Sequence, residues 1–156
     1  MIRIGLISDT HGLLRPEALD VLRGSDAIVH AGDIGEGILE TLAKIAPVTA
    51  VRGNNDRAPW AQAIHETETL RFGEITLHAL HDLSHLAIDP RAAGVDVVVH
   101  GHSHKPKIER RSGVLFVNPG SAGPVRFKLP VSVALLQVVG RQVEARVVEL
   151  ESLRTA

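Results

Sequence analysis

Short apolar runs alternate with helical segments through the first third of this 156-residue chain. Runs of strand length occupy residues 2–7, 27–29 and 48–51. The two stretches between them carry apolar side chains three and four positions apart, which is typical of amphipathic helices. A strand-helix-strand-helix-strand order predicts a parallel sheet, because each crossover is right-handed and returns the helix to the face of the sheet.

From residue 67 onward the chain consists of strand-like segments. Residues 67–78 contain two runs separated by Gly73-Glu74, which predicts a hairpin. Residues 95–99 form a continuous β-branched run, typical of a buried strand. Further runs occupy residues 107–110, 114–117, 131–139 and 142–149. We therefore expect an α/β fold, a mixed sandwich with a parallel half first and a more antiparallel half after it.

Length and composition exclude several classes of protein. A chain of 156 residues predicts one domain over residues 1–156. Because it has no cysteine, a disulfide framework and a thiol nucleophile are excluded, and any metal must bind nitrogen and oxygen. Seventeen Lys and Arg against eighteen Asp and Glu give no general attraction to duplex nucleic acid or anionic membrane. Without a signal-peptide pattern or a run of about 20 apolar residues, we expect a soluble, cytoplasmic protein.

Side chains that commonly bind metals follow the predicted strands. They are Asp9, His11, Asp33, Asn54, His81, His102 and His104. Loops at the carboxyl ends of strands converge at one edge of an α/β sheet, where ligands bind. Two pairs in this set are spaced i, i+2, so in extended chain both members point to the same side. Mixed imidazole, carboxylate and amide ligands suit Mn, Fe, Zn or Ni.

The order of these motifs resembles the calcineurin-like metallophosphoesterase superfamily, and more closely its small single-domain bacterial and archaeal phosphodiesterases. The motifs are Asp-x-His, Gly-Asp, Gly-Asn-x-Asp, His and Gly-His-x-His, followed by Asn118-Pro119-Gly120-Ser121. The resemblance implies a four-layer α-β-β-α sandwich. It also implies two divalent metal ions, with Mn expected first and Fe, Zn or Ni as alternatives.

The resemblance further implies a role for each ligand. Asp9, His11 and His104 would hold the first metal, whereas Asn54, His81 and His102 would hold the second. Asp33 would bridge the two ions. A hydroxide shared by the ions would then attack the phosphorus of a small phosphodiester, or also of a monoester.

Two positions depart from the family pattern. Asn55 stands where many members have a histidine, and an amide cannot act as a general acid, so we expect slow turnover of poor leaving groups. Asn55 and Arg57 are candidate substrate-binding residues, and Arg57 or His85 is a candidate to offset the loss of the histidine at position 55. Asp82 stands where glycine is usual. It could support His81, bind a metal or be solvated.

The remaining histidines favour structural interpretations. We expect His30 and His100 to be buried and hydrogen-bonded, or to support the ligands, and His65 and His78 to be structural or exposed. The alternative function is a protein-interaction scaffold on the same fold, as in the eukaryotic retromer subunit that resembles this family. That subunit departs from the ligand set, which this chain keeps, so an enzyme is favoured. The sequence leaves the natural substrate and the oligomeric state open.

Overall fold

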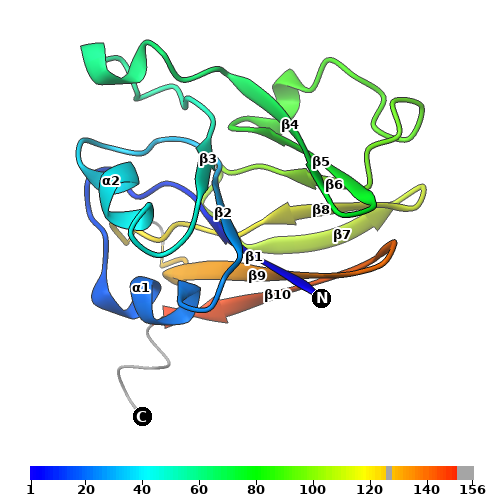
Figure 1. Cartoon of the computed structure of the whole chain (residues 1–156). Helices are drawn as coiled ribbons and strands as arrows, with labels where there is room; N and C mark the ends of the chain where they lie inside the picture. Colours follow the sequence, from blue (N-terminus) through cyan, green and yellow to red (C-terminus); the bar gives the residue numbers. More distant parts are fainter. Residues whose placement is uncertain (126–127, 151–156) are drawn as a thin grey trace.

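Two five-stranded sheets pack face to face in this chain (Figure 1). The structure is a computed structural model and describes residues 1–125 and 128–150. In chain order the elements are β1 (Ile2–Ile7), α1 (Pro16–Leu22), β2 (Ala27–His30), α2 (Ile38–Leu42), β3 (Val48–Ala50), the 3₁₀ helix η1 (Pro59–Ala61), β4 (Thr67–Phe72), β5 (Ile75–Leu80), the 3₁₀ helix η2 (Leu83–His85), β6 (Val97–Val99), β7 (Lys107–Arg111), β8 (Val114–Asn118), β9 (Ser132–Val139) and β10 (Gln142–Glu149).

The first sheet has the order β10-β9-β1-β2-β3. Strands β1, β2 and β3 are parallel, with Leu6 opposite Val29 and Val29 opposite Thr49, which confirms the predicted parallel half. Strand β9 pairs antiparallel with β1, and β10 pairs antiparallel with β9. The last hairpin of the chain therefore returns to the first sheet and places β1 at its centre.

The second sheet has the order β4-β5-β6-β8-β7. The predicted hairpin at Gly73-Glu74 is confirmed, because β4 and β5 pair antiparallel on either side of it. Strands β5, β6 and β8, however, are parallel, and only the two edge strands, β4 and β7, are antiparallel to their neighbours. This sheet is more parallel than the sequence suggested, since hydrophobic patterning marks a strand without identifying its partner. The α/β fold class with mixed sheets is confirmed.

Three apolar clusters hold the layers together. The largest lies between the two sheets and includes Leu6, Val29, Leu77 and Val97. A second cluster packs α1 and α2 against the outer face of the first sheet. A third, around Phe116, lies on the outer face of the second sheet, where η2 and the segment after it form the outer layer. No helix within residues 1–125 and 128–150 is both long and apolar enough to cross a membrane.

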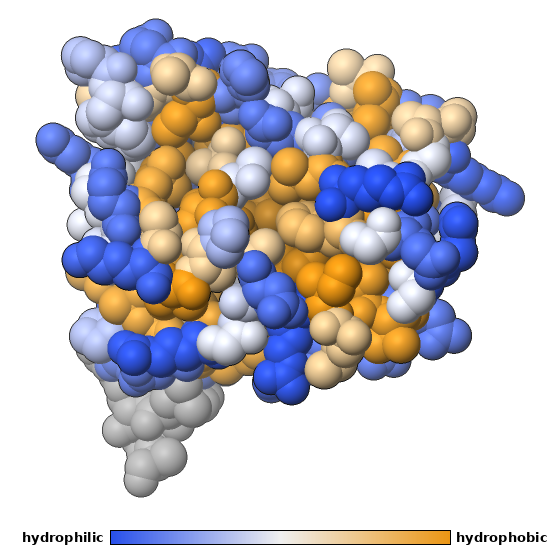
Figure 2. Space-filling view, viewed as in Figure 1, coloured by the Kyte–Doolittle hydropathy of each residue, from blue (hydrophilic) through white to orange (hydrophobic). Residues whose placement is uncertain are grey.

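The sandwich is open along one side, where the edge strands β3 and β4 face each other (Figure 1). A groove of about 490 Å³ lies between these edges. Apolar side chains gather on this face of the molecule (Figure 2), and those that line the groove are Leu39, Val48, Ala50, Ile64 and Leu70. This groove is separate from the carboxyl-end loops that carry the predicted ligands.

His30 ends β2 and is fully buried, as the sequence suggested. Its Nδ1 accepts a hydrogen bond from the backbone N–H of Gly32 at 3.1 Å, so the ring proton is on Nε2. Nε2 donates to the Thr10 hydroxyl at 3.0 Å, and that hydroxyl donates to the Ile34 carbonyl at 2.5 Å. Burial lowers the pKa of His30 from 6.5 to about 3, so the ring is neutral and ties two ligand-bearing loops together.

We expect His30 to make the fold sensitive to acid. Between pH 6.5 and 3 the unfolded chain takes up a proton at this residue and the folded chain does not, so stability falls as the pH falls. The loss between pH 7.5 and pH 5 should be about 2 kcal/mol. Urea unfolding in EDTA measures it. His30→Gln should flatten the pH dependence, whereas exposed His65→Gln should not, and equal slopes for the two variants would contradict this assignment.

Candidate metal centre

The structure brings the seven predicted ligands to one end of the sandwich, where strands of both sheets end. Two groups of side chains are spaced to hold a cation, Asp9-His11-His104 and Asp9-Asp33-His81, and in each the ligand atoms lie within 4.8 Å of one another. Asp9 belongs to both groups. The first group matches the set predicted for the first metal, and the second brings His81 and Asp33 together beside it.

The Asp9 carboxylate is fully buried, and its two oxygens have different surroundings. Oδ2 accepts hydrogen bonds from the Ser8 hydroxyl at 2.7 Å and from the backbone N–H of His102 at 3.1 Å. Oδ1 has no hydrogen-bond partner among the described residues, and it lies 3.4 Å from Nε2 of His104. Burial raises the pKa of Asp9, but His104, His81 and Ser8 outweigh it and hold the pKa below its usual value. One oxygen is thus fixed by the protein and the other is left for a cation.

His81 is oriented in the same way. Its Nδ1–H donates to the Ala31 carbonyl at 2.7 Å, which directs Nε2 toward Asp33 Oδ2 at 3.2 Å and Asp9 Oδ1 at 3.8 Å. Burial lowers the pKa of His81, but the adjacent Asp33 carboxylate and the charge of Asp9 raise it overall. A backbone carbonyl that fixes Nδ1–H is the usual support of a histidine metal ligand, because it leaves Nε2 to bind the ion.

The buried polar atoms fit a divalent cation. Asp9 Oδ1, His81 Nε2 and His104 Nδ1 are buried and have no hydrogen-bond partner among the described residues. Leaving such atoms unpaired costs about 1–3 kcal/mol each. A bound ion would remove that cost for Asp9 Oδ1 and His81 Nε2, which lie 3.8 Å apart, and imidazole and carboxylate donors suit Mn, Fe, Zn or Ni.

Asn54 and His102 lie at the open side of the centre and are exposed. Asn54 Oδ1 is 3.2 Å from His102 Nδ1, and the His102 ring centroid is 5.2 Å from that of His81 in an edge-on arrangement. The two residues predicted to share the second metal with His81 are therefore its neighbours. Both side chains are therefore accessible from solvent, whereas His81 is buried.

Asp33 is held by Asn55, a contact that the sequence did not suggest. The backbone N–H of Asn55 donates to Asp33 Oδ1 at 2.9 Å, and its side-chain amide donates to Oδ2 at 3.2 Å. Burial raises the pKa of Asp33, but His81 and the Asn55 backbone lower it to about 2. Arg57 donates from Nε to the Asn54 carbonyl at 3.1 Å and so braces the same loop. The substrate-binding roles of Asn55 and Arg57 stay predictions.

Asp82 contacts His102 rather than His81. Its Oδ2 lies 3.8 Å from His102 Nε2 and 3.7 Å from Nε2 of the exposed His85, while Oδ1 accepts two hydrogen bonds from Ser84 at the start of η2. Burial raises the pKa of Asp82, but the bonds from Ser84 and the nearby histidines lower it overall. Of the three alternatives for Asp82, support of a ligand fits best, with His102 as that ligand.

Five of the predicted ligands have left-handed backbone conformations. They are Asp9, His11, Asp33, His102 and His104, with φ between 47° and 70°. Non-glycine residues rarely adopt this conformation, which costs on the order of 1 kcal/mol or more and concentrates at functional sites. The concentration of these residues at one place marks the site independently of side-chain chemistry, and sequence patterns do not reveal it.

Two glycines let backbone approach the carboxylates closely. A Cβ at Gly53 would overlap the Asp33 carboxylate, and a Cβ at Gly101 would overlap the Ser8 hydroxyl. Both residues precede ligand positions at strand ends. The absence of a Cβ at these two positions leaves room for the neighbouring Asp33 and Ser8 side chains.

Asp56 is the functional residue that sequence reasoning left without a role. It is 4% exposed, and its carboxylate accepts three backbone hydrogen bonds, from Asp33 N at 2.9 Å, Ile34 N at 2.9 Å and Gly53 N at 2.8 Å. It therefore joins the loop after β2 to the loop after β3. Its place at the end of the Gly-Asn-x-Asp motif was the available signal.

The turn after β8 supports the centre from the other side. Asn118 donates from Nδ2 to the Gly101 carbonyl at 3.2 Å and to the Ser103 hydroxyl at 3.1 Å. Ser121 donates to the Asp9 carbonyl at 3.1 Å. His100 is buried as expected, but its ring makes no hydrogen bond with the part of the chain that the structure describes. Burial and the nearby Arg111 and Lys107 lower its pKa to about 4.

We expect Asp56→Asn to destabilise the fold and the centre together. An amide in place of the carboxylate presents N–H to at least one backbone N–H, so the free energy of unfolding should fall by about 3 kcal/mol. Urea unfolding in EDTA measures this change without a contribution from bound metal. The exposed Asp89→Asn is the matched control, and a loss no larger than that of the control would show that Asp56 does not hold these loops.

Comparison with known proteins gives a consistent picture. The sequence pattern of the calcineurin-like phosphoesterase superfamily domain matches residues 2–141. A probable metallophosphoesterase of Methanothermobacter thermautotrophicus is 35% identical over 93% of this chain and 91% of that protein. Phosphodiesterase YfcE of Escherichia coli is 29% identical over 87% and 88%. The structure of Vps29 from Entamoeba histolytica complexed with zinc superposes with a TM-score of 0.76 at 24% identity, covering 96% and 99% of the two chains, which shows likeness of fold.

Proposed function

This chain belongs to the calcineurin-like phosphoesterase superfamily, and from that premise we propose that it hydrolyses small phosphodiesters, and also monoesters, with two divalent metal ions. The observation that carries the proposal is the buried Asp9 carboxylate, whose unpartnered Oδ1 belongs to both groups of ligand atoms. Mn is the metal to test first, with Fe, Zn and Ni as alternatives.

Some residues of the site would bind the ions, and others hold those ligands in position. Asp9, His11 and His104 would hold the first ion, Asn54, His81 and His102 the second, and Asp33 would lie between them. When bound, such a pair of ions activates water for attack on phosphorus and neutralises charge on the phosphate oxygens. Asn55 keeps Asp33 in place, and the Ala31 carbonyl does the same for His81. No side-chain nucleophile is needed.

We expect hydrolysis of bis-p-nitrophenyl phosphate that requires Mn²⁺ and is abolished by EDTA. Asp33→Asn should lower kcat/KM at least about 100-fold, because removing a ligand costs no less than removing its support. Release of p-nitrophenol measures the rate. Asp20→Asn, on the exposed side of α1, is the control. If Asp33→Asn matched the wild type, or if neither this diester nor p-nitrophenyl phosphate were hydrolysed with Mn²⁺, the proposal would fail.

A second candidate is a protein-interaction scaffold without catalysis. The apolar groove between β3 and β4 favours it, because a contiguous apolar surface often marks a binding face (Figure 2). Metal content separates the two functions. Nearly two ions per chain together with activity supports the enzyme, whereas a protein that binds no metal and shows no Mn²⁺-stimulated activity supports the scaffold.

We expect the missing general acid to matter most for poor leaving groups. An alkoxide must be protonated as it departs, whereas p-nitrophenolate need not be, and general-acid catalysis contributes about 10²- to 10⁴-fold. If Arg57, through its charge, or His85, by protonating the leaving group, offsets this loss, one of the variants Arg57→Ala and His85→Ala should lower kcat for an alkyl phosphodiester at least about tenfold and barely alter the p-nitrophenyl reaction. Unchanged rates for both variants would remove both candidates.

A further inference from the structure

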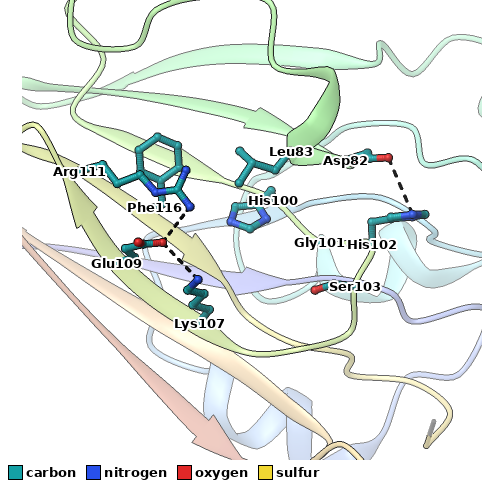
Figure 3. A pocket seen from close by; sticks show the side chains of 10 residues that line it. All are labelled: Asp82, Leu83, His100, Gly101, His102, Ser103, Lys107, Glu109, Arg111 and Phe116. Atoms are coloured by element: carbon teal, nitrogen blue, oxygen red, sulfur yellow. Dashed lines mark hydrogen bonds and ion pairs between the residues drawn. The ribbon is translucent and has the colours of Figure 1, made fainter. Parts of the chain in front are cut away.

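A pocket of about 230 Å³ opens beside the metal centre, on the outer face of the second sheet (Figure 3). Asp82 and His102, which lie at the edge of the centre, also line the pocket, so the two spaces adjoin. An organic group attached to a phosphate at the centre can reach it. Pockets for drug-sized ligands have volumes of about 300–1,000 Å³, and this pocket is smaller. Its size therefore favours a single ring system over a longer chain.

The ring of His100 projects into this pocket and lies between Leu83 and Lys107 (Figure 3). It is only 9% exposed, yet its nitrogens have no hydrogen-bond partner among the described residues. In every protonation state an imidazole carries at least one N–H donor, and the unpartnered ring nitrogens of His100 are accessible from the pocket. The ring therefore offers a hydrogen bond to a group that enters the pocket.

The far wall of the pocket is flat and carries positive charge at its rim. Phe116 of β8 is covered by the guanidinium of Arg111, 4.9 Å from the ring centroid. Lys107 and Arg111 lie 3.3 Å and 2.9 Å from the same oxygen of Glu109, so two cations face one carboxylate (Figure 3). Aromatic and guanidinium planes stack on planar rings. Asp82 also lines the pocket, so the lining holds two carboxylates and two cations.

We propose that this pocket binds the nucleobase of a nucleotide-derived phosphoester whose phosphate lies at the metal centre. The base stacks against Arg111 and Phe116, and a ring acceptor takes the hydrogen bond from His100. This assignment rests on the proposed phosphoesterase function and names its substrate class. Arg111 lies in β7, Phe116 lies in β8 and His100 directly follows β6. Of the residues that line the pocket, only His102 belongs to the predicted ligand set.

Binding of AMP and ribose 5-phosphate tests the pocket, because the two share a phosphate and a sugar and differ in the base. Isothermal titration calorimetry with the Mn²⁺-loaded full chain should show AMP binding on the order of tenfold more tightly. Arg111→Gln and His100→Leu should each reduce this ratio to about twofold or less. Arg110→Gln is the matched control on the same strand, because its guanidinium bonds the Val143 carbonyl away from the pocket, and it should keep the wild-type ratio.

The outcomes separate the two proposals. Equal affinities of the wild type for AMP and ribose 5-phosphate, or a ratio that survives in both pocket variants, would overturn the pocket assignment and leave the phosphoesterase proposal standing. If neither compound bound to the Mn²⁺-loaded protein, the phosphate site itself would fail. Arg111 is half exposed, so its variant tests the pocket even if His100→Leu does not fold.

Discussion

The burial of the Asp9 carboxylate is the constraint on which the site depends. Asp9 lies two residues after β1, the central strand of the first sheet, and its side chain has no exposure to water. A buried carboxylate is costly unless donors or cations surround it. Ser8 and a backbone N–H satisfy one oxygen, while histidines surround the other. A bound metal ion would pair with this second oxygen.

Two kinds of support keep the ligands in strained positions. Asn55 donates a hydrogen bond to Asp33, and His81 donates one to the Ala31 carbonyl, which fixes these two ligands. Asp56 fixes the loops themselves by accepting hydrogen bonds from three backbone N–H groups. The left-handed conformations at Asp9 and Asp33 persist because rigid strands and these bonds hold them. The positions of the ligand side chains therefore depend on the surrounding residues as much as on the ligands themselves.

The metal centre also couples the two sheets. His11 follows a strand of the first sheet, while His81 and His104 follow strands of the second, so their approach to Asp9 exists only when the sheets are packed. The apolar cluster between the sheets provides that packing. The pocket beside the centre, by contrast, is built almost entirely on the second sheet.

The sequence by itself determined the local elements and the ligands. Apolar runs of strand length, a Gly-Glu turn and polar residues after each strand predicted the parallel half of the fold, the hairpin and the seven side chains that meet at its edge, because these features depend on nearby residues. Only the tertiary structure decided which strands pair and which side chains contact one another. It placed β9 beside β1, made β5, β6 and β8 parallel, directed Asp82 to His102, gave Asp56 its three backbone donors and left the buried His100 without a hydrogen bond. These contacts join residues far apart in the chain, and their geometry follows from how the two sheets pack, which no local pattern encodes.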